Sequence, residues 1–292
     1  MWVVLSFVSA LCLGLYDLAK KSSVRDNAVP MVLLLNVLTG ASIYLPIILW
    51  SGWIQPLDAT GHGLLFAKSA LVGASWTFAF FALKHLPITI AAPIRATSPL
   101  WTILIAVLLM GEQPTPIQWL GIAIIMGAFA YFSTTGKSEG IYFRRNRWVG
   151  LMIVATLLGA TSSIYDKFLL QRCGYAPVTV QAWFSIYLCP VMTPLALYWG
   201  LRDRKSKPFQ FRWTIPAIAV CLLIADILYF TAIATDDAMV SVISPVRRTS
   251  VIIPFAFGIL VLSEKNWKPK LLSILLMLLG VALVGINSLG SD

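Results

Sequence analysis

Charged residues are scarce in this chain of 292 residues. They make up 12% of it, whereas an average soluble domain carries about 25%. Hydrophobic residues make up 59%, and the mean hydropathy is +0.83. So few charges cannot cover a water-facing surface, which excludes a soluble enzyme, a nucleic-acid-binding protein and a disordered scaffold. The net charge of +10 instead suits a membrane protein, whose cytoplasmic loops carry an excess of Lys and Arg.

Residues that bind metals or perform covalent catalysis are also scarce. The two histidines, His62 and His85, are too few for a His-based zinc site. The four cysteines lie far apart and form neither a disulfide framework nor a metal-binding spacing. The sequence has no HExxH or GxSxG motif and no Walker-type phosphate loop. We therefore expect no metal, no cofactor and no enzymatic activity.

Long apolar windows dominate the sequence, and a helix needs about 20 apolar residues to cross a bilayer. The ten windows are residues 2–19, 31–51, 64–83, 88–110, 116–135, 149–170, 178–200, 214–234, 238–262 and 270–288. The connectors between them are too short to hold a soluble domain. The pattern predicts an all-α integral membrane protein with ten transmembrane helices.

Lys and Arg residues are distributed unevenly between the two predicted faces. Sixteen of the 22 lie in connectors that follow odd-numbered windows, whereas Arg172 alone lies on the opposite face. Basic connectors are normally cytoplasmic. The distribution therefore predicts a multi-pass protein of the cell inner (plasma) membrane, with basic loops in the cytoplasm and both termini outside.

The two halves of the sequence repeat short motifs. The tetrapeptide SIYL occurs at residues 42–45 and again at 185–188, and PIRATS at 93–98 corresponds to PVRRTS at 245–250. Each half has five windows, an odd number, so the second half must cross the membrane in the opposite sense. Inverted repeats of this kind are typical of secondary transporters. An ancient duplication without functional use is the alternative.

The sequence resembles the drug/metabolite transporter superfamily, in particular its EamA-like ten-helix branch. The resemblance is carried by the two Pro-x-Arg-x-Thr-Ser segments and by Glu112 and Glu264, which follow the same windows at an offset of 152 residues. It implies a first repeat at residues 1–136, a cytoplasmic linker at 137–148 and a second repeat at 149–292. It also implies a central cavity between the repeats, lined mainly by windows 1, 3, 4, 6, 8 and 9. It does not specify a substrate, because members move amino acids, nucleotide sugars, drugs and other metabolites.

Ionisable residues inside a membrane usually face a cavity or one another. Matching their depths in the windows predicts two pairs, Asp17–Arg95 near the cytoplasmic face and Asp166–Arg247 near the outer face. Each pair is a candidate gate that holds one side closed. Static ion pairs are the alternative and, for Asp17, so is a bond to the lysines that follow it at the helix end.

Asp226 lies about 12 residues, or ~18 Å, into its window and thus near the midplane. This depth makes it the candidate site for proton or ion coupling, with Arg248 as its expected neighbour. A permanent Asp226–Arg248 structural pair is the alternative. Neither residue has a charged counterpart in the first half, where Ala74 and Ala96 stand.

Arginines and aromatic residues define the predicted substrate site. Lys68 and Lys167 are expected to extend towards the outer interface, which leaves arginines to bind a carboxylate or phosphate. Trp76 and Phe80 lie four residues apart, on one helix face, although packing in lipid or core is the alternative. The predicted substrate-binding residues are Arg95, Arg247, Arg248, Trp76, Phe80, Tyr16 and Tyr165.

These features predict a secondary active transporter, an exporter, that moves a small polar or amphipathic metabolite such as an amino acid or organic anion by alternating access. Its expected partners are the substrate, the lipid bilayer and a coupling proton or ion. Ala123 and Gly127 form a small-xxx-small pair and a candidate homodimer contact. A non-transporting membrane partner and a lipid-modifying membrane protein are the alternatives.

Overall fold

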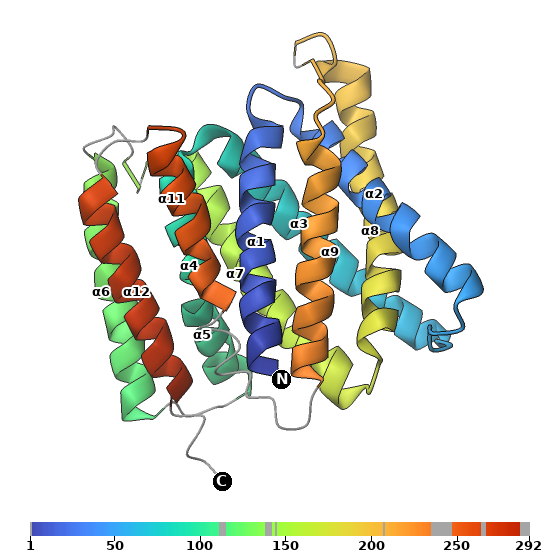
Figure 1. Cartoon of the computed structure of the whole chain (residues 1–292), viewed down its shortest axis with the longest axis horizontal. Helices are drawn as coiled ribbons and strands as arrows, with labels where there is room; N and C mark the ends of the chain where they lie inside the picture. Colours follow the sequence, from blue (N-terminus) through green and yellow to red (C-terminus); the bar gives the residue numbers. More distant parts are fainter. Residues whose placement is uncertain are drawn as a thin grey trace.

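The computed structural model describes residues 2–110, 115–137, 142–143, 145–206, 208–234, 247–263 and 267–286. These residues form helices and no strand, so the all-helical class is confirmed for the described part of the chain (Figure 1). Glu112, Glu264 and Pro245, which carry part of the family resemblance, lie outside these ranges, as does part of the 137–148 linker.

Helix is present in every window that the sequence predicts. The α-helices are α1 (Trp2–Val24), α2 (Val29–Trp50), α3 (Ala59–His85), α4 (Ile88–Ala96), α5 (Ser98–Met110), α6 (Pro116–Lys137), α7 (Arg147–Lys167), α8 (Pro177–Tyr198), α9 (Thr214–Ile233), α11 (Ile252–Leu260) and α12 (Trp267–Ile286). Short segments of other helix types are η1 (Phe168–Arg172), η2 (Trp199–Asp203) and η3 (Thr249–Val251). Within the described ranges, six helical segments are long and apolar enough to cross a membrane.

Local signals in the sequence start several helices. The Asp58 side chain accepts a hydrogen bond from the Gly61 amide at 2.7 Å and caps α3. Asn146 likewise accepts from the Trp148 amide at 2.9 Å and caps α7. Such caps satisfy amides that have no partner within the first turn of a helix.

Helices from the two halves of the chain pack against each other. α1 lies along α9, α3 along α7, α2 against α8 and α6 along α12 (Figure 1). α4 and α5 contact α7, and α11 contacts α1. The α6–α12 contact is especially close, because a Cβ atom added to Gly280 would lie 2.7 Å from the carbonyl oxygen of Gly121.

The predicted window at 88–110 is two helices that meet at Thr97. Pro93 and Pro99 flank the break, and proline both lacks an amide donor and disfavours helix in the residue before it. In the second half, the short η3 helix begins at Thr249, which is 152 residues after Thr97. Both halves therefore interrupt their fourth window at corresponding positions.

Several connectors meet at one end of the bundle. The N-terminal end of α1 and the C-terminal end of α12 lie at the other end (Figure 1). Lys21 donates to the carbonyl oxygen of Leu86 at 2.6 Å, and Asn27 donates to that of Gln210 at 2.8 Å. These bonds join the α1–α2, α3–α4 and η2–α9 connections.

Two of the lysines that the sequence assigns to the basic connectors are buried inside helices. α1 continues past residue 19 to Val24, so Lys20 is helical and buried. Lys270 lies in α12, is fully buried and donates to the Thr89 hydroxyl at 2.9 Å. Exposed basic residues such as Arg25 and Arg204 do remain at this end.

Candidate functional site

A cavity of about 170 Å³ lies between the two halves of the chain. It is lined by residues of α1, α3, α4, α5, α7, α8 and α9 and by Arg247 and Arg248. Most of its charged groups occupy three clusters.

The first cluster contains one carboxylate and two cations. The Lys20 amine lies 2.7 Å from Asp17 Oδ1, and Arg95 Nη1 donates to the same oxygen. The Lys20 amine also lies 4.1 Å from the centre of the Tyr16 ring. The predicted Asp17–Arg95 pair and the alternative contact with a lysine are thus both present.

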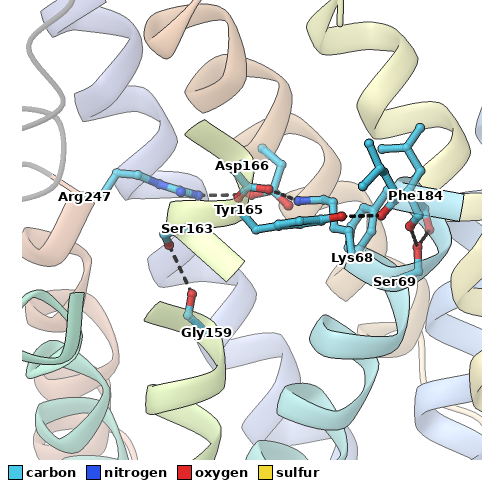
Figure 2. A network of polar contacts seen from close by, with 11 residues as sticks. Lys68, Ser69, Gly159, Ser163, Tyr165, Asp166, Phe184 and Arg247 are labelled. Atoms are coloured by element: carbon cyan, nitrogen blue, oxygen red, sulfur yellow. Dashed lines mark hydrogen bonds and ion pairs between the residues drawn. The ribbon is translucent and has the colours of Figure 1, made fainter. Parts of the chain in front are cut away.

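The second cluster is the buried ion pair of Lys68 and Asp166 (Figure 2). Lys68 is 2% exposed and Asp166 is 7% exposed. The Lys68 amine also lies 4.8 Å from the Phe184 ring centre. The expectation that Lys68 reaches the outer interface is therefore wrong, as is the predicted Asp166–Arg247 pair. The reason is lateral packing, because α3 lies along α7 and brings Lys68 to Asp166.

The third cluster joins Asp226 to Arg247. Arg247 Nη2 donates to Asp226 Oδ1 at 3.1 Å, and its guanidinium carbon lies 3.7 Å from the centre of the Tyr229 ring. Figure 2 shows Arg247 entering from the side opposite Lys68. The sequence reasoning expected Arg248 beside Asp226, and this expectation is wrong. Asp226 and Tyr229 are three residues apart on α9, so one helix face presents both to Arg247.

Arg248 lies apart from these three clusters. Its Nη2 donates to the Ser98 hydroxyl at 3.1 Å, and its buried Nε has no hydrogen-bond partner. Within the described ranges no carboxylate lies within ion-pair distance of Arg248. Arg95 and Arg247 lie close enough to repel it electrostatically, and Asp17 lies close enough to attract it.

The predicted aromatic residues divide between the cavity and the core. Trp76 and Tyr16 line the cavity. Phe80 is instead fully buried in the hydrophobic core. Tyr165 lies away from the cavity, where its hydroxyl donates to the Leu64 carbonyl at 3.1 Å (Figure 2). Tyr165 is therefore not among the residues that line the cavity, although its neighbour Asp166 is.

Three cavity residues that the predicted site omitted have a common sequence signal. Lys20, Ser98 and Tyr229 each follow a predicted site residue by three positions. Residues three apart in a helix lie on the same face. The i+3 positions after Asp17 and Asp226 could thus have identified Lys20 and Tyr229, whereas Ser98 depends on the break at Thr97.

The sequence of this chain matches a known family. A model of the EamA-like transporter family matches residues 1–134 and 146–286. The chain belongs to the EamA-like transporter family. It is therefore a multi-pass membrane transporter by family, in agreement with the resemblance noted in its sequence.

Relatives of this EamA-like protein include an uncharacterized transporter of Archaeoglobus fulgidus, 22% identical over 90% of both chains. A riboflavin transporter of Brucella anthropi is 27% identical over 65% of this chain and 62% of its own. A UDP-galactose transporter homolog of Eremothecium gossypii is 30% identical over 31% of this chain and 29% of its own. The last two matches span less than two thirds of those relatives. A crystal structure with 16% identity covers 98% of both chains with a TM-score of 0.64, which shows the shared fold.

The buried Lys68–Asp166 pair gives a direct test of the site's architecture. Replacing Lys68 with Met leaves an unpaired carboxylate in the interior, and we expect a loss of about 3–5 kcal/mol in the free energy of unfolding. In the Lys68→Met variant, adding Asp166→Asn removes the unpaired carboxylate, and we expect it to restore most of the lost free energy of unfolding. Denaturation of the purified protein in detergent measures both effects.

The matched control is Lys167→Met, which removes an exposed lysine from the same helix as Asp166. We expect its stability to stay within about 0.5 kcal/mol of wild type. Equal stability of Lys68→Met and Lys167→Met would contradict the buried pair.

Proposed function

We propose that this EamA-like protein is a secondary active transporter that exports a small metabolite with an acidic group, such as an amino acid or an organic anion. The observation that carries the proposal is Arg248, a cation at the central cavity with a hydroxyl partner but no described carboxylate partner. A planar guanidinium binds both oxygens of a carboxylate or phosphate. An acidic substrate would supply the partner that Arg248 lacks.

The charge balance of the whole cavity supports an anionic substrate. Asp166 and Asp226 each form an ion pair with one cation, whereas Asp17 forms ion pairs with two. Together with Arg248, this leaves cations in excess of carboxylates among the described residues. The N-terminus of α5 begins at Ser98 beside Arg248, and a helix N-terminus also favours negative charge.

We further propose that residues 1–136 and 149–292 are inverted five-helix repeats. The packing supports this arrangement, because exchanging the halves turns the largest helix contacts into contacts that are also observed. The α1–α9 contact becomes α7–α3, and α1–α11 becomes the contact of α7 with α4 and α5. The α2–α8 and α6–α12 contacts become themselves.

We also propose alternating access, which this arrangement supports. The Asp17–Lys20–Arg95 cluster joins α1 to α4, and the Lys68–Asp166 pair joins α3 to α7. An acidic substrate that competes for the cations would weaken these bonds in turn.

We also propose that the protein lies in the cell inner (plasma) membrane, with the basic connectors in the cytoplasm and both termini outside.

The relatives support a polar metabolite as the substrate but do not identify it, because two of them are named for riboflavin and UDP-galactose.

We further propose that the protein forms a homodimer through α6. Ala123 and Gly127 are exposed on this helix, and a Cβ atom added to Gly127 would meet nothing within 4 Å.

Replacing Arg248 with Gln tests the anion site. We expect the variant to bind acidic metabolites at least tenfold more weakly, because the unpaired guanidinium is lost. A thermal-shift screen of metabolites first finds a ligand, since a ligand specific for the folded state raises the melting temperature. Counterflow in liposomes then measures its transport.

The control for Arg248 is Arg172→Gln, which removes an exposed arginine. Equal binding by both variants and wild type would contradict the anion site. Product formation without counterflow would instead indicate a lipid-modifying protein, and ligand binding without flux a non-transporting partner.

Replacing Asp226 with Asn tests proton coupling. We propose that Asp226 releases Arg247 when protonated, so the variant should exchange substrate across the membrane but fail to accumulate it along a proton gradient. Liposomes with an imposed pH gradient measure both activities. If the variant accumulates substrate along a proton gradient as well as wild type does, Asp226 is not the residue that couples transport to protons.

A further inference from the structure

Asp17 binds two cations at the central cavity, and these two cations are held very differently. The Lys20 side chain is 3% exposed, and its amine also lies 4.1 Å from the centre of the Tyr16 ring and 5.6 Å from that of Phe80. The Arg95 side chain is 32% exposed, and Asp17 is the one hydrogen-bond partner of its guanidinium among the described residues. Lys20 is thus fixed in place, whereas Arg95 reaches the cavity that it lines.

One cation is enough to neutralise Asp17. If Arg95 leaves, the carboxylate keeps its 2.7 Å ion pair with Lys20, so no buried charge is left unpaired. Lys68 and Arg247 cannot leave in this way, because each is the one described cation within ion-pair distance of its carboxylate. Removing the partner of a buried charge is strongly destabilising. Arg95 is therefore the paired cation that is most available to a substrate.

Arg95 lies beside Arg248, the proposed anion-binding residue. Arg248 Nη2 donates to the Ser98 hydroxyl at 3.1 Å, and Ser98 follows Arg95 by three residues. The chain keeps turning between them, because the Thr97 amide donates to the Ile94 carbonyl at 3.2 Å. Residues three apart in a helical turn have Cβ atoms about 5–6 Å apart. Both guanidiniums line the same cavity and lie close enough to repel each other, so one small molecule can contact both.

The charges at the cavity favour a substrate with two negative charges. Among the described residues, five cations line the cavity and three carboxylates bind four of them. This leaves two positive charges in excess, one in the cluster at Asp17 and one on Arg248. Charged groups inside a membrane usually pair with one another. A monoanion would neutralise one of the two charges, whereas a dianion neutralises both and relieves the repulsion between the guanidiniums.

We propose that the substrate is a small dianion that binds between Arg95 and Arg248, and that Lys20 is a positioning residue that keeps Asp17 paired when Arg95 moves to the substrate. This inference rests on the proposed function, in which an acidic group binds at Arg248. Two carboxylates or one phosphate group supply the same charge, and a guanidinium binds the oxygens of either. The move also breaks the bond between α1 and α4, so binding of the dianion releases this gate.

The first test compares acids that differ by one charge. The probes are succinate against succinamate, in which an amide replaces one carboxylate, and methyl phosphate against dimethyl phosphate. Thermal shift measures their binding at about pH 8, where a phosphate monoester carries two charges. We expect wild type to bind succinate or methyl phosphate at least about tenfold more tightly than its monoanionic partner, the effect of one hydrogen bond to a charged group. The pair that shows the preference identifies the acidic group.

The second test separates the two residues. Arg95→Gln keeps the Asp17–Lys20 pair but removes the second guanidinium, so it should bind both members of the pair equally. Lys20→Met should also lose the preference, because Arg95 can then leave only by exposing an unpaired Asp17. Adding Asp17→Asn to Lys20→Met should restore the preference, since Arg95 then has no carboxylate to leave. A merely structural role of Lys20 would not give this recovery.

The control is Lys167→Met, which removes an exposed lysine and should keep the preference. If wild type binds dianions and monoanions equally, or binds monoanions only, the dianion is wrong and the proposed function stands. A preference that survives in Arg95→Gln, or that the double variant fails to restore, would overturn the roles of Arg95 and Lys20. If no acid binds wild type and Arg248→Gln changes nothing, the proposed function fails and this inference fails with it.

Discussion

The structure depends on one constraint, which is that a charge inside a membrane bundle needs a partner of opposite sign. The described cations that line this cavity are Lys20, Lys68, Arg95, Arg247 and Arg248, and the carboxylates that bind four of them are those of Asp17, Asp166 and Asp226. The described residues cannot pair them one to one. Asp166 therefore joins the two halves through Lys68, whereas Asp17 and Asp226 bind cations within their own halves. The guanidinium of Arg248 lines the cavity without a described carboxylate partner, and we propose that an acidic solute fits there.

The constraint also explains why the two halves differ. A strict repeat would pair Asp166 with Arg247 as Asp17 pairs with Arg95. Asp226 and Lys68 change this pattern, because Asp226 binds Arg247 and Lys68 binds Asp166. The second half therefore contributes a carboxylate near the predicted midplane, while the first half supplies Lys68, which binds the opposite half. This asymmetry suits a transporter whose coupling and gating groups are separate.

Sequence patterns predicted the helices well and the side-chain partners only in part. Apolar length alone predicted a window at each described α-helix, although not the break at Thr97, and depth along the chain correctly matched Asp17 with Arg95. Depth does not report which helices are lateral neighbours, so the Lys68–Asp166 pair across α3 and α7 was missed. It also cannot separate Arg247 from Arg248, whose directions differ by about 100° and depend on the start of the helix. Phe80 shows the same limit, since composition does not tell a cavity wall from a packed core.

The central claim is that the cavity can be reached from either side of the membrane. Ser163 lines it, and among the described residues its hydroxyl donates to the Gly159 carbonyl of its own helix, so a Ser163→Cys change leaves the charge clusters intact. In a variant with the four native cysteines replaced by alanine, a membrane-impermeant maleimide should label Cys at this position from both sides, and a bound acidic metabolite should protect it. Labelling from one side only, or labelling that no ligand slows, would contradict alternating access to this cavity.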